Sequence, residues 1–251
     1  LIGKAPYAGL HTAEGRRGQI LFTLEDVPEG FTRESIFCHL LGHHIGTIAG
    51  RKIPVIAGLS PATHVDGLKA ISAAAASSGG VEHWHGLGIT PDAPDVETAF
   101  GGVAPQAVHK ITRADLRAAR DALSAGRDGP LDMVQLGTPH FSPSEFAGLL
   151  AALDGRKVKV PTQVSTSRFV RDFAQEKITA LEKLGVSIVT DTCTYYSPRA
   201  RGVEGRIMTN AAKWAWYAPG MLGVEAVFGS LKECAESAIR GEVWRDAELE
   251  L

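Results

Sequence analysis

Two hydrophobic patterns alternate along the chain. Short runs rich in Val and Ile have the length of buried strands, and longer segments between them carry apolar residues at helical spacing. This alternation is typical of β-α units, in which helices cover the faces of a mostly parallel sheet. We therefore expect an α/β fold, a three-layer helix-sheet-helix sandwich, with strands at residues 19–25, 53–57, 81–85, 132–136, 157–161, 186–190, 206–209 and 225–228.

Helix start signals occur in several segments between these strands. Thr112 and Asp115 have the spacing of a capping box, and Ser142 with Glu145 has the same spacing. A Gly-rich loop is expected around Gly101. Helices are predicted at residues 33–49, 63–77 and 112–125, from residue 142, from 164–168 to 184, and after residue 230.

Polar residues recur where the predicted strands end. Strand 132–136 leads into Gly137-Thr138-Pro139-His140, and strand 186–190 leads into Asp191-Thr192-Cys193. Strand 206–209 is followed by Asn210 in the same way. Ligands of open α/β sheets bind beyond the carboxyl ends of the strands, so these junctions are the predicted place for chemistry.

A hydroxyl-rich segment with a guanidinium lies at one predicted helix start. Thr166, Ser167 and Arg168 would combine side-chain donors with the free N-H groups of the first helical turn. Such a group suits a carboxylate or phosphate. The alternative from the residues alone is an ordinary Ser/Thr cap beside a solvated arginine.

Three further polar residues follow the next strands. Cys193 stands among polar residues at a strand end, which suits a metal ligand or a reactive thiolate, although a free Cys is also commonly buried as a small hydrophobe. Asn210 and Lys213 lie three residues apart near a helix start, where both could face an anionic substrate. A lysine on a helix is, however, usually just solvated.

The histidine-rich segments and the other two cysteines favour packing roles. His39 and His43 have i,i+4 spacing, but no HExxH pattern accompanies them, and hydrogen-bonding or packing is the preferred interpretation for His83 and His85 as well. Cys38 and Cys234 lie in amphipathic helical patterns, and both are predicted to be buried core residues. With no CxxC spacing among its three cysteines, the chain predicts neither a disulfide framework nor a self-contained metal module.

Composition narrows the class of function. The 251 residues are 44% hydrophobic and 22% charged, as in a globular domain, and the formal net charge of -2 argues against nucleic-acid or anionic-membrane binding. The apolar runs are shorter than the roughly 20 residues that cross a bilayer, and no secretory leader opens the chain. We expect a cytoplasmic protein acting on a small molecule, and the start at Leu1 suggests a fragment, a processed product or one part of a larger enzyme.

Taken in order, a set of short motifs resembles the catalytic component of the aconitase X family. The resemblance extends across almost the whole chain and rests on the order and spacing of its pieces. These pieces are Ala5-Pro6-Tyr7-Ala8-Gly9-Leu10-His11, Arg16-Arg17, Leu41-Gly42, Gly67-Leu68-Lys69, Ala76-Ser77-Ser78-Gly79, Gly88-Ile89-Thr90-Pro91, Leu136-Gly137-Thr138-Pro139-His140, Thr166-Ser167-Arg168, Thr190-Asp191-Thr192-Cys193, Met208-Thr209-Asn210-Ala211-Ala212-Lys213, Tyr217-Ala218-Pro219-Gly220 and Phe228-Gly229-Ser230-Leu231.

This resemblance implies a hydro-lyase with an aconitase-like fold and an iron-sulphur cluster held by cysteines, Cys193 among them. A base would remove the proton α to the carboxylate while iron withdraws the β-hydroxyl. The resemblance assigns the substrate anion to Arg168 with the Thr166 and Ser167 hydroxyls. The pocket would further contain Asn210, Lys213 and His140, and no residue is identified as the base.

The resemblance also implies substrates and partners. Residues 1–251 would be the C-terminal part of the catalytic domain, divided into lobes at about 1–110 and 111–251, and would need a preceding N-terminal segment and a small swivelling domain or subunit. The family dehydrates cis-3-hydroxy-L-proline or mevalonate 5-phosphate. Two-subunit forms tend to have Cys where this chain has Thr138, which favours cis-3-hydroxy-L-proline and a smaller or altered cluster. The alternatives are mevalonate 5-phosphate dehydration and a non-catalytic fragment or subunit that needs a partner chain.

Overall fold

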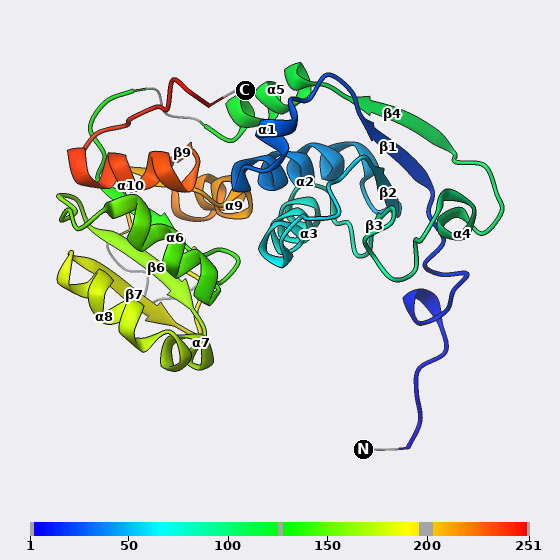
Figure 1. Cartoon of the computed structure of the whole chain (residues 1–251), viewed down its shortest axis with the longest axis horizontal. Helices are drawn as coiled ribbons and strands as arrows, with labels where there is room; N and C mark the ends of the chain where they lie inside the picture. The colour runs from blue at the N-terminus through cyan, green and yellow to red at the C-terminus, as the bar shows by residue number, and fades with distance from the viewer. Residues whose placement is uncertain (1–2, 125–127, 196–202, 250–251) are drawn as a thin grey trace.

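Two parallel sheets form the framework of the protein (Figure 1). The computed structural model describes residues 3–124, 128–195 and 203–249. Every registered strand pair is parallel, which confirms the predicted α/β fold. The first sheet has the order β3-β2-β1-β4, with β1 (Ile20–Leu24), β2 (Pro54–Ala57), β3 (His85–Gly86) and β4 (Ala107–Ile111). The second has the order β7-β6-β5-β8-β9, with β5 (Met133–Leu136), β6 (Thr162–Thr166), β7 (Val186–Thr190), β8 (Arg206–Thr209) and β9 (Glu225–Phe228).

Helices cover these sheets unequally. The second sheet has helices on both faces, whereas the first is covered on one face by long helices and on the other by a small cluster that includes the short α4 (Val96–Phe100). No helix in the described ranges is long and apolar enough to span a membrane. The remaining helices are η1 (Gly9–His11), α1 (Glu29–Thr32), α2 (Ser35–Ala49), α3 (Val65–Gly79), α5 (Arg113–Ala122), α6 (Pro143–Leu153), α7 (Arg168–Phe173), α8 (Gln175–Lys183), α9 (Ala212–Leu222) and α10 (Leu231–Arg240).

A single apolar layer joins the two sheets. Figure 1 shows α2, α3 and α9 in the middle of the molecule, between them. Trp214 of α9 is fully buried in the same core cluster as Phe22 of the first sheet and Phe228 of the second. Burying an aromatic side chain of this size stabilises the fold by about 2–3 kcal/mol. The two sheets therefore share one core.

Small residues bring α2 and α3 into close contact. Gly42 and Gly46 lie one turn apart on α2, and a Cβ atom at either position would come within 2.5 to 2.6 Å of a carbonyl oxygen of α3, that of Ile71 or Ala75. Only glycine permits this approach, because any side chain would collide with the α3 backbone. The alanine-rich sequence of α3 presents the matching flat surface.

Local start signals were predicted correctly. The capping boxes at Thr112 and at Ser142 are both present, with the side chain of Asp115 or Glu145 accepting the cap N-H. A third capping box joins Ser230 and Glu233 at the start of α10. These reciprocal bonds satisfy N-H groups that would otherwise lack partners at a helix start.

Several predicted boundaries were wrong. Residues 157–161, predicted as a strand, are irregular, and the strand is β6, which follows them. The helix predicted to start at 164–168 therefore begins only at Arg168, and it is interrupted at Ala174. Lys157 to Pro161 alternates charged and apolar residues like a strand, whereas β6 buries the hydroxyl residues Thr162, Ser165 and Thr166. The strand expected at 81–85 is reduced to β3, and the Gly-rich region contains α4 and leads to β4, which were not predicted.

A buried ion pair joins helices on the two sheets. The Glu233 carboxylate of α10 is fully buried and accepts hydrogen bonds of 2.6 and 2.9 Å from Nη2 of Arg120, in α5. The same carboxylate accepts the main-chain N-H groups of Ser230 and Asp246 at 2.8 and 3.1 Å. Its negative charge is thus compensated mainly by one arginine from the other half of the molecule.

Replacing Arg120 with Leu is expected to lower the free energy of unfolding by about 3 kcal/mol, because the buried carboxylate loses its main counter-charge. Urea unfolding of the purified protein measures this change. Arg117→Leu, on the exposed face of the same helix, is the matched control and is expected to change stability by less than about 0.5 kcal/mol. Equal effects of the two substitutions would contradict a stabilising role for the ion pair.

Candidate functional site

The predicted junctions all lie at one edge of the second sheet. Its five strands are parallel, so the segments that follow β5, β6, β7 and β8 leave the sheet at the same end. These segments are 137–140, 167–168, 191–193 and 210–213. The sequence prediction depended on this arrangement, which parallel pairing enforces.

Direct contacts connect three of these segments. Asp191 N donates to the Thr166 carbonyl at 2.9 Å, and the Asp191 carboxylate accepts Arg168 N at 3.0 Å and forms an ion pair with the guanidinium. Asp191 takes up the left-handed backbone conformation (φ 53°), which turns the chain sharply after β7 and which Asp tolerates better than most residues. His140 Nε2 lies 3.1 Å from the carbonyl oxygen of Thr192.

The predicted anion-binding residues differ in what they can offer a ligand. Thr166 is fully buried and its hydroxyl donates to the Phe141 carbonyl at 2.8 Å, so this hydroxyl holds the turn in place. Ser167 Oγ accepts Val170 N at 3.1 Å and caps α7. Arg168 is the accessible member of the group, with its side chain 73% exposed. Their contact with a substrate stays a prediction.

Cys193 is half-buried beside α9. Trp214 Nε1 of α9 donates to Thr194 Oγ1 at 3.0 Å, which places the loop after β7 near the first turn of α9, where Lys213 lies. Burial and the neighbouring Cys193 thiol raise the pKa of Tyr195. The thiol of Cys193 thus lies beside the Tyr195 hydroxyl and is only partly buried.

The described residues supply only one accessible thiol. Cys38 and Cys234 are buried in α2 and α10, as predicted, and burial raises the pKa of Cys38 to about 12 and that of Cys234 well above its usual value. Across residues 3–124, 128–195 and 203–249, no group of three or more His, Cys, Asp or Glu side chains is arranged to hold a metal ion. These residues therefore fit one ligand position and not a complete metal centre.

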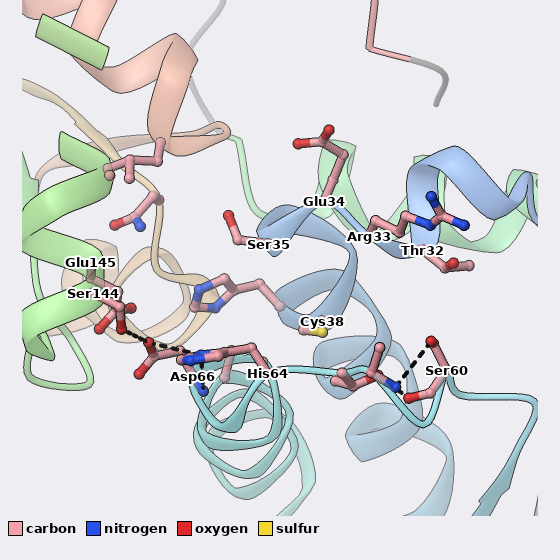
Figure 2. Close-up of a pocket in the computed structure, with 18 residues that line it drawn as sticks. Thr32, Arg33, Glu34, Ser35, Cys38, Ser60, His64, Asp66, Ser144 and Glu145 are labelled. Atoms are coloured by element: carbon pink, nitrogen blue, oxygen red, sulfur yellow. Dashed lines mark hydrogen bonds and ion pairs between the residues drawn. The ribbon is translucent and has the colours of Figure 1, made fainter. Parts of the chain in front are cut away.

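Asn210 faces a different space from the other predicted residues. It lines a cavity of about 510 Å³ between α2, the start of α3 and the start of α6. Figure 2 shows Ser144 and Glu145 of α6 beside Asp66 of α3, with Ser35 and Cys38 of α2 also in the wall. The full lining is Thr32, Arg33, Glu34, Ser35, Cys38, His39, Ser60, Ala62, Thr63, His64, Asp66, Gly67, Ala70, Ser144, Glu145, Gly148, Asn210 and Leu231.

Lys69 connects this cavity with the sheet edge. Its ammonium group contacts Asp66 Oδ1 at 3.1 Å, forms an ion pair with Glu145 and donates to the His140 carbonyl at 3.0 Å. Sequence reasoning missed this contact, because Lys69 lies more than 70 positions from His140 and Glu145. The available signals were the Gly67-Leu68-Lys69 motif and the capping box at Ser142.

The two carboxylates beside Lys69 have opposite pKa shifts. Burial acts to raise the pKa of Asp66, but the hydroxyls of Ser144 and Ser142 together with Lys69 more than offset it, so the net shift is downward. Burial raises the pKa of Glu145, and Lys69 only partly compensates. Asp66 is therefore the stronger acid of the pair.

The histidines of α2 are buried as neutral groups. Burial, assisted by the positive charge of Lys69, lowers the pKa of His39 to about 4, and burial together with His44 lowers that of His43 to about 4. The two rings pack edge-on against Phe228 and Trp216 respectively. Packing is thus the role that the structure gives them, as the sequence favoured.

Sequence models of two domains match most of the chain. The aconitase X second domain matches residues 18–121, and the aconitase X third domain matches residues 131–240. The chain belongs to the aconitase X family.

Relatives within this family are dehydratases by name. A cis-3-hydroxy-L-proline dehydratase of Pseudomonas aeruginosa is 38% identical and one of Hypocrea jecorina is 35% identical, each over 96% of this chain and 42% of the relative. The phosphomevalonate dehydratase large subunit of Methanosarcina mazei is 29% identical over 96% of this chain and 57% of its own length. The aconitase X chain thus spans about two fifths to three fifths of these relatives.

A solved structure shows the same fold. The crystal structure of Thermococcus kodakaraensis aconitase X in its holo-form matches with a TM-score of 0.81 and 24% sequence identity. The match covers 94% of this chain and 59% of that one. The two-sheet arrangement described above is therefore the arrangement found in aconitase X.

The buried His39 predicts a pH dependence of stability. Its pKa is about 6.5 in the unfolded chain and about 4 in the folded one, so the unfolded state takes up the proton first and stability falls as the pH falls from about 7 to about 4. The expected loss for this residue is about 2 kcal/mol between about pH 7.5 and about pH 5. Urea unfolding at both pH values measures it.

In His39→Gln, stability at about pH 5 should fall less, relative to about pH 7.5, than in the wild type, because the titrating group is gone. His11→Gln, at an exposed position of η1, serves as the control and should keep the wild-type dependence. An unchanged pH dependence in His39→Gln would show that this ring is not buried as a neutral group.

Proposed function

We propose that the protein containing this chain is a hydro-lyase that removes water from cis-3-hydroxy-L-proline. The observation that carries the proposal is the 35% to 38% identity with two cis-3-hydroxy-L-proline dehydratases over 96% of the chain, against 29% for a phosphomevalonate dehydratase large subunit. The convergence of the predicted residues on one sheet edge supports it. Dehydration breaks the bonds to the α-hydrogen and the β-hydroxyl, forms a carbon-carbon double bond and releases water.

The sheet edge offers binding groups for such a substrate. Arg168 is accessible and charged, so it takes the substrate carboxylate, while Ser167 and Thr166 fix the turn that carries it. His140 and Lys213 supply further polar groups, and Asn210 adds an amide at the neighbouring cavity. No described residue is assigned as the base that removes the α-proton.

An iron-sulphur centre belongs to the proposal, with Cys193 as the ligand from this chain. The described residues do not fit a complete cluster, because the other two cysteines are buried in helices. The remaining ligands have to come from outside the residues described here. The binding roles given above do not depend on the centre.

A partner surface is proposed over α7. Phe169 and Phe173 are 81% and 75% exposed, next to Arg168, and large apolar side chains in adjacent exposed positions are typical of a covered surface. Relatives such as that of Methanosarcina mazei are named large subunits, which suggests a smaller one. We propose a small swivelling domain or subunit that excludes water from the sheet edge.

Two other functions remain as alternatives. Mevalonate 5-phosphate dehydration is favoured by the 29% identity with the large subunit of Methanosarcina mazei, and it would require a further basic group for the phosphate. A non-catalytic chain that acts only with a partner is favoured by the exposed aromatic side chains of α7. Assays of both substrates with the full-length protein, with and without a small subunit, distinguish these functions.

Cys193→Ser in the full-length protein, purified without oxygen, is expected to lose bound iron and sulphide and nearly all dehydration of cis-3-hydroxy-L-proline. A thiolate ligand is lost and a serine hydroxyl replaces it poorly. Metal analysis and substrate turnover measure the two losses. Cys234→Ala, at a cysteine buried in α10, should retain both. A Cys193→Ser protein with its iron and turnover intact would refute the ligand role.

Arg168→Gln is expected to raise the KM for cis-3-hydroxy-L-proline by about 10- to 100-fold, because a charge-assisted hydrogen bond to the carboxylate is lost. Steady-state kinetics of the full-length enzyme measure the change. Arg171→Gln, on the same helix and paired with Asp172, is the matched control and should leave KM unchanged. Similar kinetics for the two variants would remove Arg168 from the binding site.

A further inference from the structure

Asp191, the residue that follows β7, holds the turn between β6 and α7 in three places. Its main-chain N-H donates to the Thr166 carbonyl at 2.9 Å, and its Oδ1 accepts the main-chain N-H of Arg168 at 3.0 Å. Its Oδ2 forms an ion pair with Nε of Arg168. β6 and β7 are paired up to Thr166 and Thr190, so these contacts continue the pairing past the end of the sheet. The main chain and the side chain of Arg168 are therefore both tied to one carboxylate.

The backbone of Asp191 has a left-handed conformation that few side chains adopt. Its φ is 53°, and Asp154 has a similar φ of 47°. Asp154 is the C-cap of α6, and helices commonly end with a residue in this conformation. Asp191 ends no helix, since it follows a strand. Its conformation instead accompanies the contacts with the turn before α7, and such backbone strain often marks a functional segment.

The ion pair leaves part of the Arg168 guanidinium free. A guanidinium has five N-H donors, one on Nε and two on each terminal nitrogen. Asp191 Oδ2 is paired with Nε, and within residues 3–124, 128–195 and 203–249 neither terminal nitrogen of Arg168 has a hydrogen-bond partner. A ligand carboxylate binds a guanidinium best through two parallel N-H groups. The two terminal nitrogens meet that requirement while Asp191 stays in place.

Both side chains of this pair are in contact with water, so the pair adds little to stability. The Arg168 side chain is 73% exposed and that of Asp191 is 38% exposed. Water screens the attraction within such a pair, and it also screens the repulsion between Asp191 and a second carboxylate. An exposed arginine without a partner, in contrast, has to give up its rotational freedom when a ligand binds. Holding the guanidinium beforehand lowers that cost.

We propose that Asp191 is a positioning residue, which orients the guanidinium of Arg168 for the carboxylate of the substrate. Asp191 holds Nε, and the substrate carboxylate binds the terminal N-H groups. Asp191 itself does not touch the substrate and takes no part in breaking the bonds to the α-hydrogen and the β-hydroxyl. The identity of the carboxylate rests on the proposed function, whereas the hold of Asp191 on Arg168 does not.

Asp191→Asn in the full-length protein tests this role by removing only the charge. Asn tolerates the left-handed conformation and still offers an oxygen to Arg168 N, so the turn is retained. The KM for cis-3-hydroxy-L-proline should rise about threefold to tenfold, because the guanidinium has to be ordered on binding. kcat and bound iron should stay within about twofold of the wild type, because only binding is weakened. Asp154→Asn, at the exposed left-handed C-cap of α6, is the matched control and should leave KM unchanged.

A double-mutant cycle tests whether Asp191 acts through Arg168. In the Arg168→Gln protein no guanidinium is left to orient, so adding Asp191→Asn should change KM by less than about twofold. The same rise in KM with and without Arg168 would overturn the proposal, and so would an unchanged or lowered KM in Asp191→Asn alone. A fall in kcat together with loss of iron would mean that Asp191 supports the Cys193 loop instead, which also overturns it.

Nuclear magnetic resonance of the full-length protein with isotope-labelled arginine follows the pair without any turnover. The Nε-H signal of Arg168 is the one missing from the spectrum of Arg168→Gln. Its exchange with water should be at least about threefold faster in Asp191→Asn than in the wild type, because a charge-assisted hydrogen bond is lost. Asp154→Asn should show the wild-type exchange rate. Equal rates in the wild type and Asp191→Asn would overturn the proposal even where dehydration is found.

This proposal and the proposed function fail in different ways. A full-length protein that does not dehydrate cis-3-hydroxy-L-proline would contradict the proposed function, and faster exchange in Asp191→Asn would still show that Asp191 holds Arg168. Normal turnover by the wild type, with unchanged KM and exchange in Asp191→Asn, would contradict only the positioning role.

Discussion

The apolar layer of α2, α3 and α9 is the constraint on which the rest of the structure depends. These helices pack against one face of each sheet at the same time. Neither sheet can therefore move away without exposing Trp214, Phe22 or Phe228 to water. Exposing these three side chains would cost about 6 to 9 kcal/mol, which is comparable with the whole stability of a typical protein, about 5 to 15 kcal/mol. The carboxyl edge of the second sheet is thereby held in a fixed position relative to α2 and α3.

This fixed position explains where polar groups gather. At the starts of α3 and α6 the first N-H groups of each helix need acceptors. Asp66 and Glu145 are the acidic residues of these two first turns, and bringing them together requires a cation between them. Lys69 supplies it and, through the His140 carbonyl, ties the turn after β5 to the same point.

Which features the sequence could predict depends on how far apart the interacting residues lie along the chain. Capping boxes at Thr112 and Ser142 span three residues and were found, and strands rich in Val and Ile were found with them. β6 was misplaced because buried hydroxyls such as that of Thr166 hydrogen-bond to the main chain, which a hydrophobic pattern does not record. The contact of Lys69 with Glu145 joins residues 76 positions apart and follows only from the packing of both sheets on one layer.

The contacts of the Lys69 ammonium group determine how an anion would be received in the neighbouring cavity. An ammonium group has three N-H donors, and those of Lys69 are directed to Asp66, Glu145 and the His140 carbonyl. None is left for a ligand, so an anion entering the cavity would meet the carboxylates without a free lysine donor. Because Lys69 also holds the His140 turn, the charge in the cavity and the geometry of the sheet edge depend on the same three contacts.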